Sequence, residues 1–174
     1  MIDALVDELA TARIGATFNF YRDGPDAALR RDRLRAYLHA RASAGVLLVG
    51  EAAGYRGARV SGLPFTSERQ LTGTGRAEAT ATIVHRVLAE LGVEERVLLW
   101  NVVPTHPGTA ASNRRPSRDE VEDGVRFALR LARGRHVVAV GRLAEATLGG
   151  PYVRHPSHGG ALAFRAGLKA ALGC

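Results

Sequence analysis

The chain has 174 residues, of which 46% are hydrophobic and 24% are charged, a composition typical of one globular domain. Lys and Arg number 24 against 17 Asp and Glu, so the net charge is +7. This excess fits either a polyanionic partner or a solvated, Arg-rich surface. The one cysteine, Cys174, excludes an intramolecular disulfide, a four-cysteine iron–sulfur cluster and a zinc site built on several cysteines.

No apolar run reaches the roughly 20 residues that a membrane span needs. The first eight residues, MIDALVDE, are acidic where a signal peptide is basic. We therefore expect a cytoplasmic protein without a membrane partner, folded as a single domain over residues 1–174.

Two helices are predicted before the first strand. Apolar residues recur at helical spacing from Ile2 to Leu9 and lead into an aromatic-rich loop that ends at Gly24-Pro25. Asp26 can cap a second helix. Its apolar positions, which share one face, are Leu29, Leu34, Tyr37 and Leu38.

Three apolar runs without charges, at 46–49, 97–100 and 137–140, predict strands buried on both faces of a parallel sheet. Amphipathic segments lie between them, one over about 76–91 and one from a Ser117–Glu120 capping box to Gly134. This alternation predicts right-handed βαβ units. With a short helix at 143–148, a short strand at 152–153 and a closing helix at 161–172, the fold class is a three-layer α/β/α sandwich around a mainly parallel, four-stranded sheet.

Ligands of such sheets bind beyond the carboxyl ends of the strands, where three segments carry polar or glycine-rich sequence. The first, 50–57, reads GEAAGYRG and matches neither a P-loop nor a dinucleotide fingerprint. The second presents Asn101, whose amide offers a paired donor and acceptor to a base edge. The third, RHPSHGG at 154–160, offers backbone amides and histidines to an anion.

Two hydrolytic readings have less support from these residues. A Ser–His hydrolase lacks the G-x-S-x-G elbow. A zinc hydrolase has His106, His155 and His158 available, but no H-E-x-x-H or comparable cluster.

Taken together, the segments over residues 46–168 resemble the uracil-DNA glycosylase superfamily. GEAAG at 50–54 is similar to a Gly-rich first motif, and LPF at 63–65 to the segment whose phenylalanine stacks on a flipped uracil. WNVVP at 100–104 is similar to the segment with the base-reading Asn, and HPS at 155–157 to the late motif whose His stabilises the leaving base. The resemblance implies base flipping followed by hydrolysis of the N-glycosidic bond.

The resemblance also assigns roles to individual residues. It places the catalytic role on His155, Asn101 and Glu51. The uracil-binding set is Gly50, Glu51, Ala52, Phe65, Asn101 and His155. The DNA-binding set is Ser67, Ser157, His158, Gly159 and Gly160, with the side chain that fills the vacated base stack in the loop 158–162. We expect a monomer that needs no metal or cofactor and whose partner is uracil-containing or abasic DNA.

The first motif departs from the family pattern at three positions. Ala52 stands where the best-known branch has a water-positioning Asp and others have Asn, Ala53 replaces a Pro, and Gly54 replaces a thymine-excluding Tyr. The cysteines that bind an iron–sulfur cluster in the thermophilic branches are absent, so the chain resembles a cluster-free bacterial branch.

Three functions follow as hypotheses. The first is a monofunctional glycosylase of base-excision repair that removes uracil, and other deaminated bases, from DNA. The second is a glycosylase-fold module that binds uracil or abasic DNA with little turnover, which the missing carboxylate at Ala52 favours. The third is a nucleotide- or nucleoside-binding protein that uses the same crevice without duplex DNA.

Overall fold

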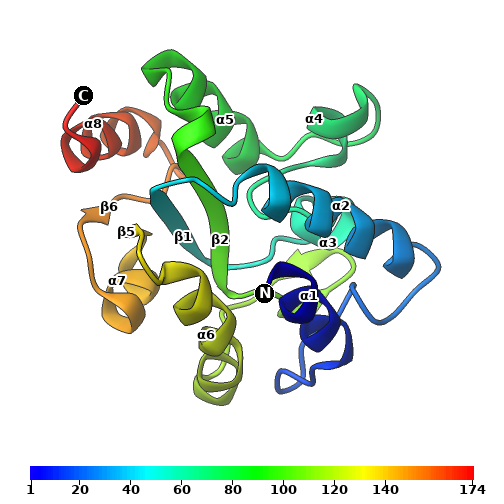
Figure 1. The fold of residues 1–174 in the computed structure, drawn as a ribbon. Helices are drawn as coiled ribbons and strands as arrows, with labels where there is room; N and C mark the ends of the chain where they lie inside the picture. Colours follow the sequence, from blue (N-terminus) through cyan, green and yellow to red (C-terminus); the bar gives the residue numbers. More distant parts are fainter.

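The computed structural model describes residues 1–174 and has a central sheet with helices on both of its faces (Figure 1). The strand order is β2-β1-β5-β6, and every neighbouring pair is parallel. The strands are β1 (Val46–Ala52), β2 (Val97–Val103), β5 (His136–Val140) and β6 (Tyr152–Val153). The predicted sandwich is confirmed, and its sheet is parallel throughout. An antiparallel hairpin of β3 (Gly108–Thr109) and β4 (Ser112–Asn113), which the sequence did not predict, lies outside this sheet.

Each face of the sheet has its own hydrophobic core, because successive side chains of a strand point to opposite faces. Leu47 and Val49 of β1 belong to one core, and Val46 and Leu48 to the other. The first core is closed by α1 (Ile2–Thr11), α2 (Ala27–Ala40), α6 (Arg118–Ala132) and α7 (Arg142–Leu148). The second is closed by α5 (Ala79–Leu91) and α8 (Ala161–Leu172). Figure 1 shows α5 and α8 on one side of the sheet and α1, α6 and α7 on the other.

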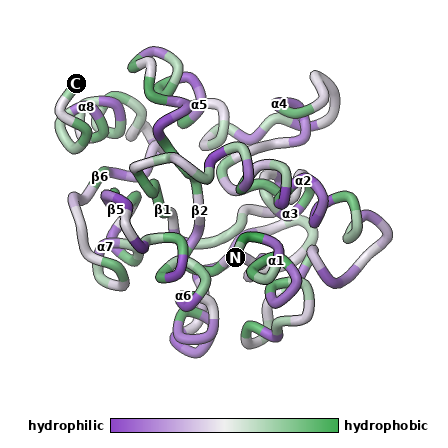
Figure 2. Tube along the Cα trace, viewed as in Figure 1, coloured by the Kyte–Doolittle hydropathy of each residue, from purple (hydrophilic) through white to green (hydrophobic).

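Helices α5 and α8 are amphipathic, and their Cα trace alternates between hydrophobic and hydrophilic positions (Figure 2). Three shorter elements complete the chain: α3 (Ala58–Ser61), α4 (Glu68–Thr72) and the 3₁₀ turn η1 (Glu94–Arg96). None of the helices combines the length and apolarity needed to cross a bilayer.

The capping box predicted for α6 is present. The Ser117 hydroxyl accepts a hydrogen bond from the Glu120 amide at 3.3 Å, and the Glu120 carboxylate accepts one from the Ser117 amide at 2.8 Å. The predicted cap of α2 is wrong in its chemistry. Asp26 holds the N-cap position without a side-chain cap hydrogen bond, because its carboxylate instead pairs with Arg30 at 3.3 Å.

Leu29, expected on the buried face of α2, is 48% exposed, and Leu129 of α6 is 50% exposed. In α6 the buried positions are Glu120, Gly124, Phe127, Ala128 and Leu131. Their spacing of three and four residues defines the inward stripe, and Leu129 falls outside it.

Helix α5 begins at Ala79, three residues later than expected. The reason is the extended backbone of Glu78, with φ −115° and ψ 127°. The residues before α5 therefore lie outside the helix, and this places Glu78 at the site described next.

Candidate functional site

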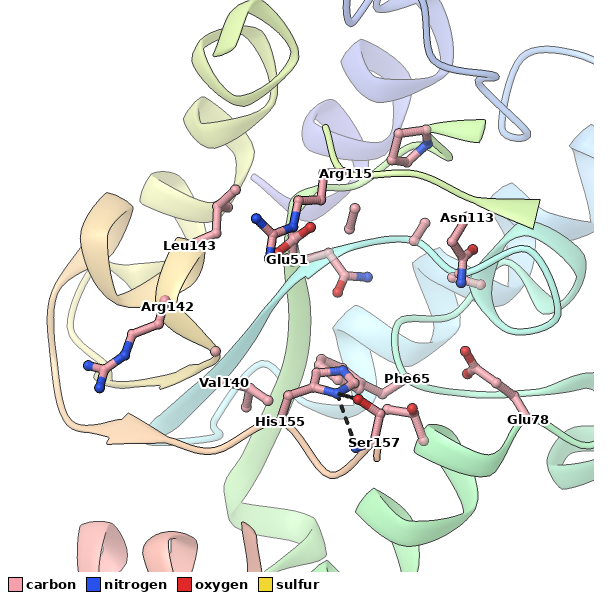
Figure 3. Close-up of a pocket in the computed structure, with 18 of the residues that line it drawn as sticks. Glu51, Phe65, Glu78, Asn113, Arg115, Val140, Arg142, Leu143, His155 and Ser157 are labelled. Atoms are coloured by element: carbon pink, nitrogen blue, oxygen red, sulfur yellow. Dashed lines mark hydrogen bonds between the residues drawn. The ribbon is translucent and has the colours of Figure 1, made fainter. Parts of the chain in front are cut away.

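The carboxyl ends of all four sheet strands border one cleft of about 700 Å³. It receives residues from β1, β2, the β3–β4 hairpin and the segments after β5 and β6. Seven residues of the predicted site line it: Glu51, Ala52, Phe65, Asn101, His155, Ser157 and His158. Figure 3 shows Phe65, His155 and Ser157 gathered in this cleft. The parallel sheet thus brings together residues that lie more than 100 positions apart in the chain.

Phe65 is held in an uncommon backbone conformation beside the cleft. Its φ is +51°, in the left-handed region that bulky residues rarely occupy. Hydrogen bonds on either side hold the segment: Ser61 donates to the Thr66 carbonyl at 2.7 Å, and Thr66 donates to the Pro64 carbonyl at 2.9 Å. Gly50 lies directly beneath the ring, because a Cβ there would overlap Phe65 Cζ. The strained backbone of Phe65 therefore lies at the point where the structure presents an aromatic ring to the cleft.

Asn101 lies in β2 directly beside Gly50 of β1. The residue is only 5% exposed, yet its side-chain amide makes no hydrogen bond within the protein, unlike Asn19, whose amide donates to Leu9 and Ala12. Buried amides are ordinarily satisfied by a partner. Asn101 does not anchor a loop, and its donor and acceptor remain available to a bound molecule.

The geometry around His155 fixes which ring nitrogen can donate. Its Nδ1 accepts a hydrogen bond from the Ser157 amide at 3.2 Å and lies 2.8 Å from the Ser157 hydroxyl. A neutral imidazole whose Nδ1 accepts must carry its proton on Nε2. Burial lowers the pKa of His155 below its usual 6.5, and the neighbouring His158 lowers it further. His155 is therefore a neutral donor through Nε2 at pH 7.

Ser157 connects the two histidines of the late segment. Its hydroxyl lies 3.1 Å from His158 Nδ1 as well as near His155. His158 is exposed and has a φ of +52°, a second strained residue at the cleft. A tight turn at 155–160 thus holds both rings.

Two predicted DNA-contacting residues are not free to bind a phosphate. Ser67 is fully buried, where it forms the N-cap of α4 and its hydroxyl donates to Gln70 at 3.0 Å. The Gly160 amide already donates to the Ser157 carbonyl at 3.0 Å. Gly160 is required for packing instead, since a Cβ there would overlap the His155 carbonyl oxygen. Gly159 is exposed and does not line the cleft.

Sequence reasoning missed several charged residues of the cleft: Glu78, Arg114, Arg115, Arg142 and Arg154. Arg114 and Arg142 make ion pairs with Glu120 and Glu145, whereas Arg115 and Arg154 make none. The arginines could have been found, because they follow β2, β5 and β6 at the same edge of the sheet as Asn101 and His155. Glu78 precedes a helix and does not follow a predicted strand. The rule that sites lie beyond the carboxyl ends of strands therefore does not find it.

His106 does not belong to a metal site with His155 and His158. It is fully buried, and its ring nitrogens lie 2.8 Å from the carbonyl oxygens of Ala53 and Thr109. The ring joins the first-motif loop, residues 50–57, to the hairpin strand β3. Its role is to fix one wall of the cleft.

Comparison with known proteins identifies the class that this fold and cleft define. The family model of the uracil DNA glycosylase superfamily matches residues 38–167. The chain belongs to this superfamily, which supports a glycosylase-type function. The crystal structure of wild-type SMUG2 from Pedobacter heparinus is similar with a TM-score of 0.72 and 13% identity, over 99% of this chain and 98% of that one. A search of curated proteins finds no match.

Proposed function

We propose that the protein is a monofunctional DNA glycosylase that hydrolyses the N-glycosidic bond of uracil in DNA and leaves an abasic site. The observation that carries the proposal is the unpaired amide of Asn101, 5% exposed at the cleft. An amide oxygen and its NH₂ group match the N3–H donor and O4 acceptor of uracil. Superfamily membership supports the same chemistry.

The cleft residues divide the work of the reaction. Phe65 offers its ring as a stacking surface for the extruded base, and Asn101 reads the base edge. When the bond between C1′ and N1 breaks, negative charge develops on uracil O2. His155 Nε2–H donates to that oxygen, and a neutral donor in a partly buried site is well suited to this. Glu51 and Ala52 contribute the wall of the base pocket, with Gly50 beneath the ring.

The DNA strand lies over the rim formed by the late segment. Arg115 and Arg154, the two cleft arginines without carboxylate partners, contact phosphates together with Ser157, His158 and Gly159. Leu162, in the first turn of α8, is 83% exposed. An apolar side chain presented to solvent two residues after the late segment suits the filling of a vacated base stack. We expect the protein to act as a monomer.

A second candidate function rests on Ala52. This residue lines the cleft, but its methyl side chain offers no hydrogen-bond acceptor with which to position water. A module that binds uracil or abasic DNA with little turnover would have the same Asn101, Phe65 and His155. The two candidates differ in whether the glycosidic bond is broken.

The deciding experiment incubates the protein with an end-labelled duplex that carries a single uracil, followed by alkaline cleavage. Strand breakage at the uracil supports the glycosylase. Tight binding to the uracil or abasic duplex without breakage supports the second candidate. Neither breakage nor preferential binding would contradict both.

A further inference from the structure

Glu78 is a carboxylate of the cleft that none of the assigned roles uses. It comes immediately before α5 and lines the cleft beside the first-motif loop. Figure 3 shows its carboxylate pointing into the cleft. Apart from Glu51, no other acidic residue lines the cleft, and the position of Ala52 carries none. The first motif has no carboxylate at position 52, and Glu78 brings one to the same cleft from the residue before α5.

The first-motif loop is shaped around this carboxylate. A Cβ on Gly54 would lie 2.6 Å from Glu78 Oε1, and a Cβ on Gly57 would lie 2.5 Å from Glu78 Oε2. Each carboxylate oxygen thus occupies the space that a side chain on the loop would fill. The contact with Glu78 explains sterically why two positions of the GEAAGYRG segment are glycine.

Glu78 is not explained as a structural residue. It makes no ion pair, in contrast to Glu120, which is held by Arg114 at 2.6 Å. It occupies the N-cap position of α5 without a side-chain cap hydrogen bond. Burial raises the pKa of Glu78, and the nearby Ala81 amide opposes this only in part. A half-buried carboxyl without a cationic partner costs stability, and such groups concentrate at functional sites.

We propose that Glu78 is the catalytic base that orients and deprotonates the attacking water, a role that rests on the proposed glycosylase function. The water oxygen bonds to C1′ as the C1′–N1 bond breaks, and that electron pair leaves with uracil as an anion held by His155. The water proton passes to the Glu78 carboxylate and then to the departing uracil. The products are neutral uracil and the abasic sugar. This assignment replaces Glu51 as the acidic residue of the reaction.

The test compares single-turnover cleavage of a uracil duplex by the parent, Glu78→Gln and the control Glu94→Gln. Glu94 is exposed on η1 and makes no ion pair. General-base catalysis contributes typically 10²–10⁴-fold, so we expect Glu78→Gln to be slower by about that factor and Glu94→Gln to match the parent. Affinity for a duplex with a non-cleavable 2′-fluorinated deoxyuridine should stay within about threefold, since the base acts in the transition state.

Two further variants separate chemistry from folding. Glu78→Asp keeps the charge but shortens its reach and should also be slow, whereas Ala52→Asp in the Glu78→Gln background should recover part of the rate. Melting temperatures identify any variant that fails to fold. A Glu78→Gln variant that cleaves within about threefold of an active parent overturns the base assignment alone. A parent that does not cleave uracil contradicts the proposed function and this inference together.

Discussion

Gly50 and Phe65 occupy complementary space, because the Cζ atom of the Phe65 ring lies where a Cβ on Gly50 would be. The two residues belong to different segments, the end of β1 and the loop that follows α3. Their contact explains why the first motif begins with glycine. It also sets the depth at which the aromatic ring lies beneath a bound base.

Gly50→Ala should therefore lower activity by displacing the ring. The new methyl would overlap Phe65 and lie 3.0 Å from Asn101 Oδ1, so stacking and edge reading both suffer. Loss of about 1–3 kcal/mol of base interaction corresponds to a roughly 5- to 160-fold lower single-turnover rate. Gly45→Ala is the matched control, since a Cβ there meets nothing within 4 Å. Equal losses in both variants would contradict this account of Gly50.

Asn101→Ala tests the reading of the base edge. Removing a bidentate amide should cost about 1–3 kcal/mol of discrimination, measured as the ratio of single-turnover rates on uracil and cytosine duplexes. Because the Asn101 amide has no partner in the protein, the substitution should change the melting temperature little. An unchanged ratio would remove Asn101 from the base-reading role.

The sheet was predictable from the sequence because parallel strands buried on both faces are uniformly apolar. Short runs without charges, such as 46–49, match this pattern. The Asn101 and His155 sites followed from the same reasoning, since both lie just at or beyond a strand's carboxyl end. The α6 capping box was readable because its two hydrogen bonds are local. These features depend on neighbours in sequence or on a regular period.

Features that depend on tertiary contacts could not be predicted. Ser67 is buried at the start of α4, a helix of five residues without a periodic signal. Glu78 reaches the cleft because its backbone is extended before α5. Gly54 and Gly57, more than 20 residues earlier in the first-motif loop, leave room for its carboxylate. No local pattern encodes such a contact.

His155→Ala should slow cleavage without an equal loss of binding. Removing one donor to a developing oxyanion costs roughly 10²–10³-fold in rate, whereas the same donor adds little in the ground state. Single-turnover rates and the affinity for a non-cleavable uracil duplex measure the two effects separately. The Ser157 hydroxyl lies 2.8 Å from His155 Nδ1, and Ser157→Ala removes it while keeping the backbone hydrogen bond to that nitrogen. This variant should therefore show a smaller rate loss of the same kind. Near-parent cleavage by His155→Ala would make the HPS segment structural only.

Binding to DNA should weaken steeply with salt, because the net charge of +7 favours association through counterion release. Arg154→Gln should reduce the slope of log affinity against log salt by about 1. Arg133→Gln is the control, since Arg133 is exposed without an ion pair and precedes β5 at the opposite edge of the sheet. A salt-independent affinity would exclude phosphate contacts and favour binding of a nucleoside instead.

His85 links folding to pH through the segment that carries Phe65. Thr66 donates its hydroxyl proton to Pro64, so His85 Nε2, 3.1 Å away, is the donor in the bond between them. Burial lowers the pKa of His85 below its usual 6.5, against a smaller opposing effect from the Phe65 backbone. The folded protein therefore favours neutral His85, while the unfolded chain takes up a proton near pH 6.5.

The sign of the pH effect follows from this difference. Well above pH 6.5 neither state is protonated at His85, and stability is fully present. As the pH falls from 6.5 towards the folded-state pKa, the unfolded chain binds more protons, so the free energy of unfolding drops by at most about 1.4 kcal/mol per pH unit for this one group. His155 adds to the drop, and Glu78, whose pKa is raised, opposes it near its lower end. In His85→Gln, which keeps a donor to Thr66 but cannot titrate, these two contributions are unchanged. Melting temperatures between pH 7.5 and 5 should thus fall less steeply in His85→Gln than in the parent, and identical slopes would show that His85 is equally protonated in both states.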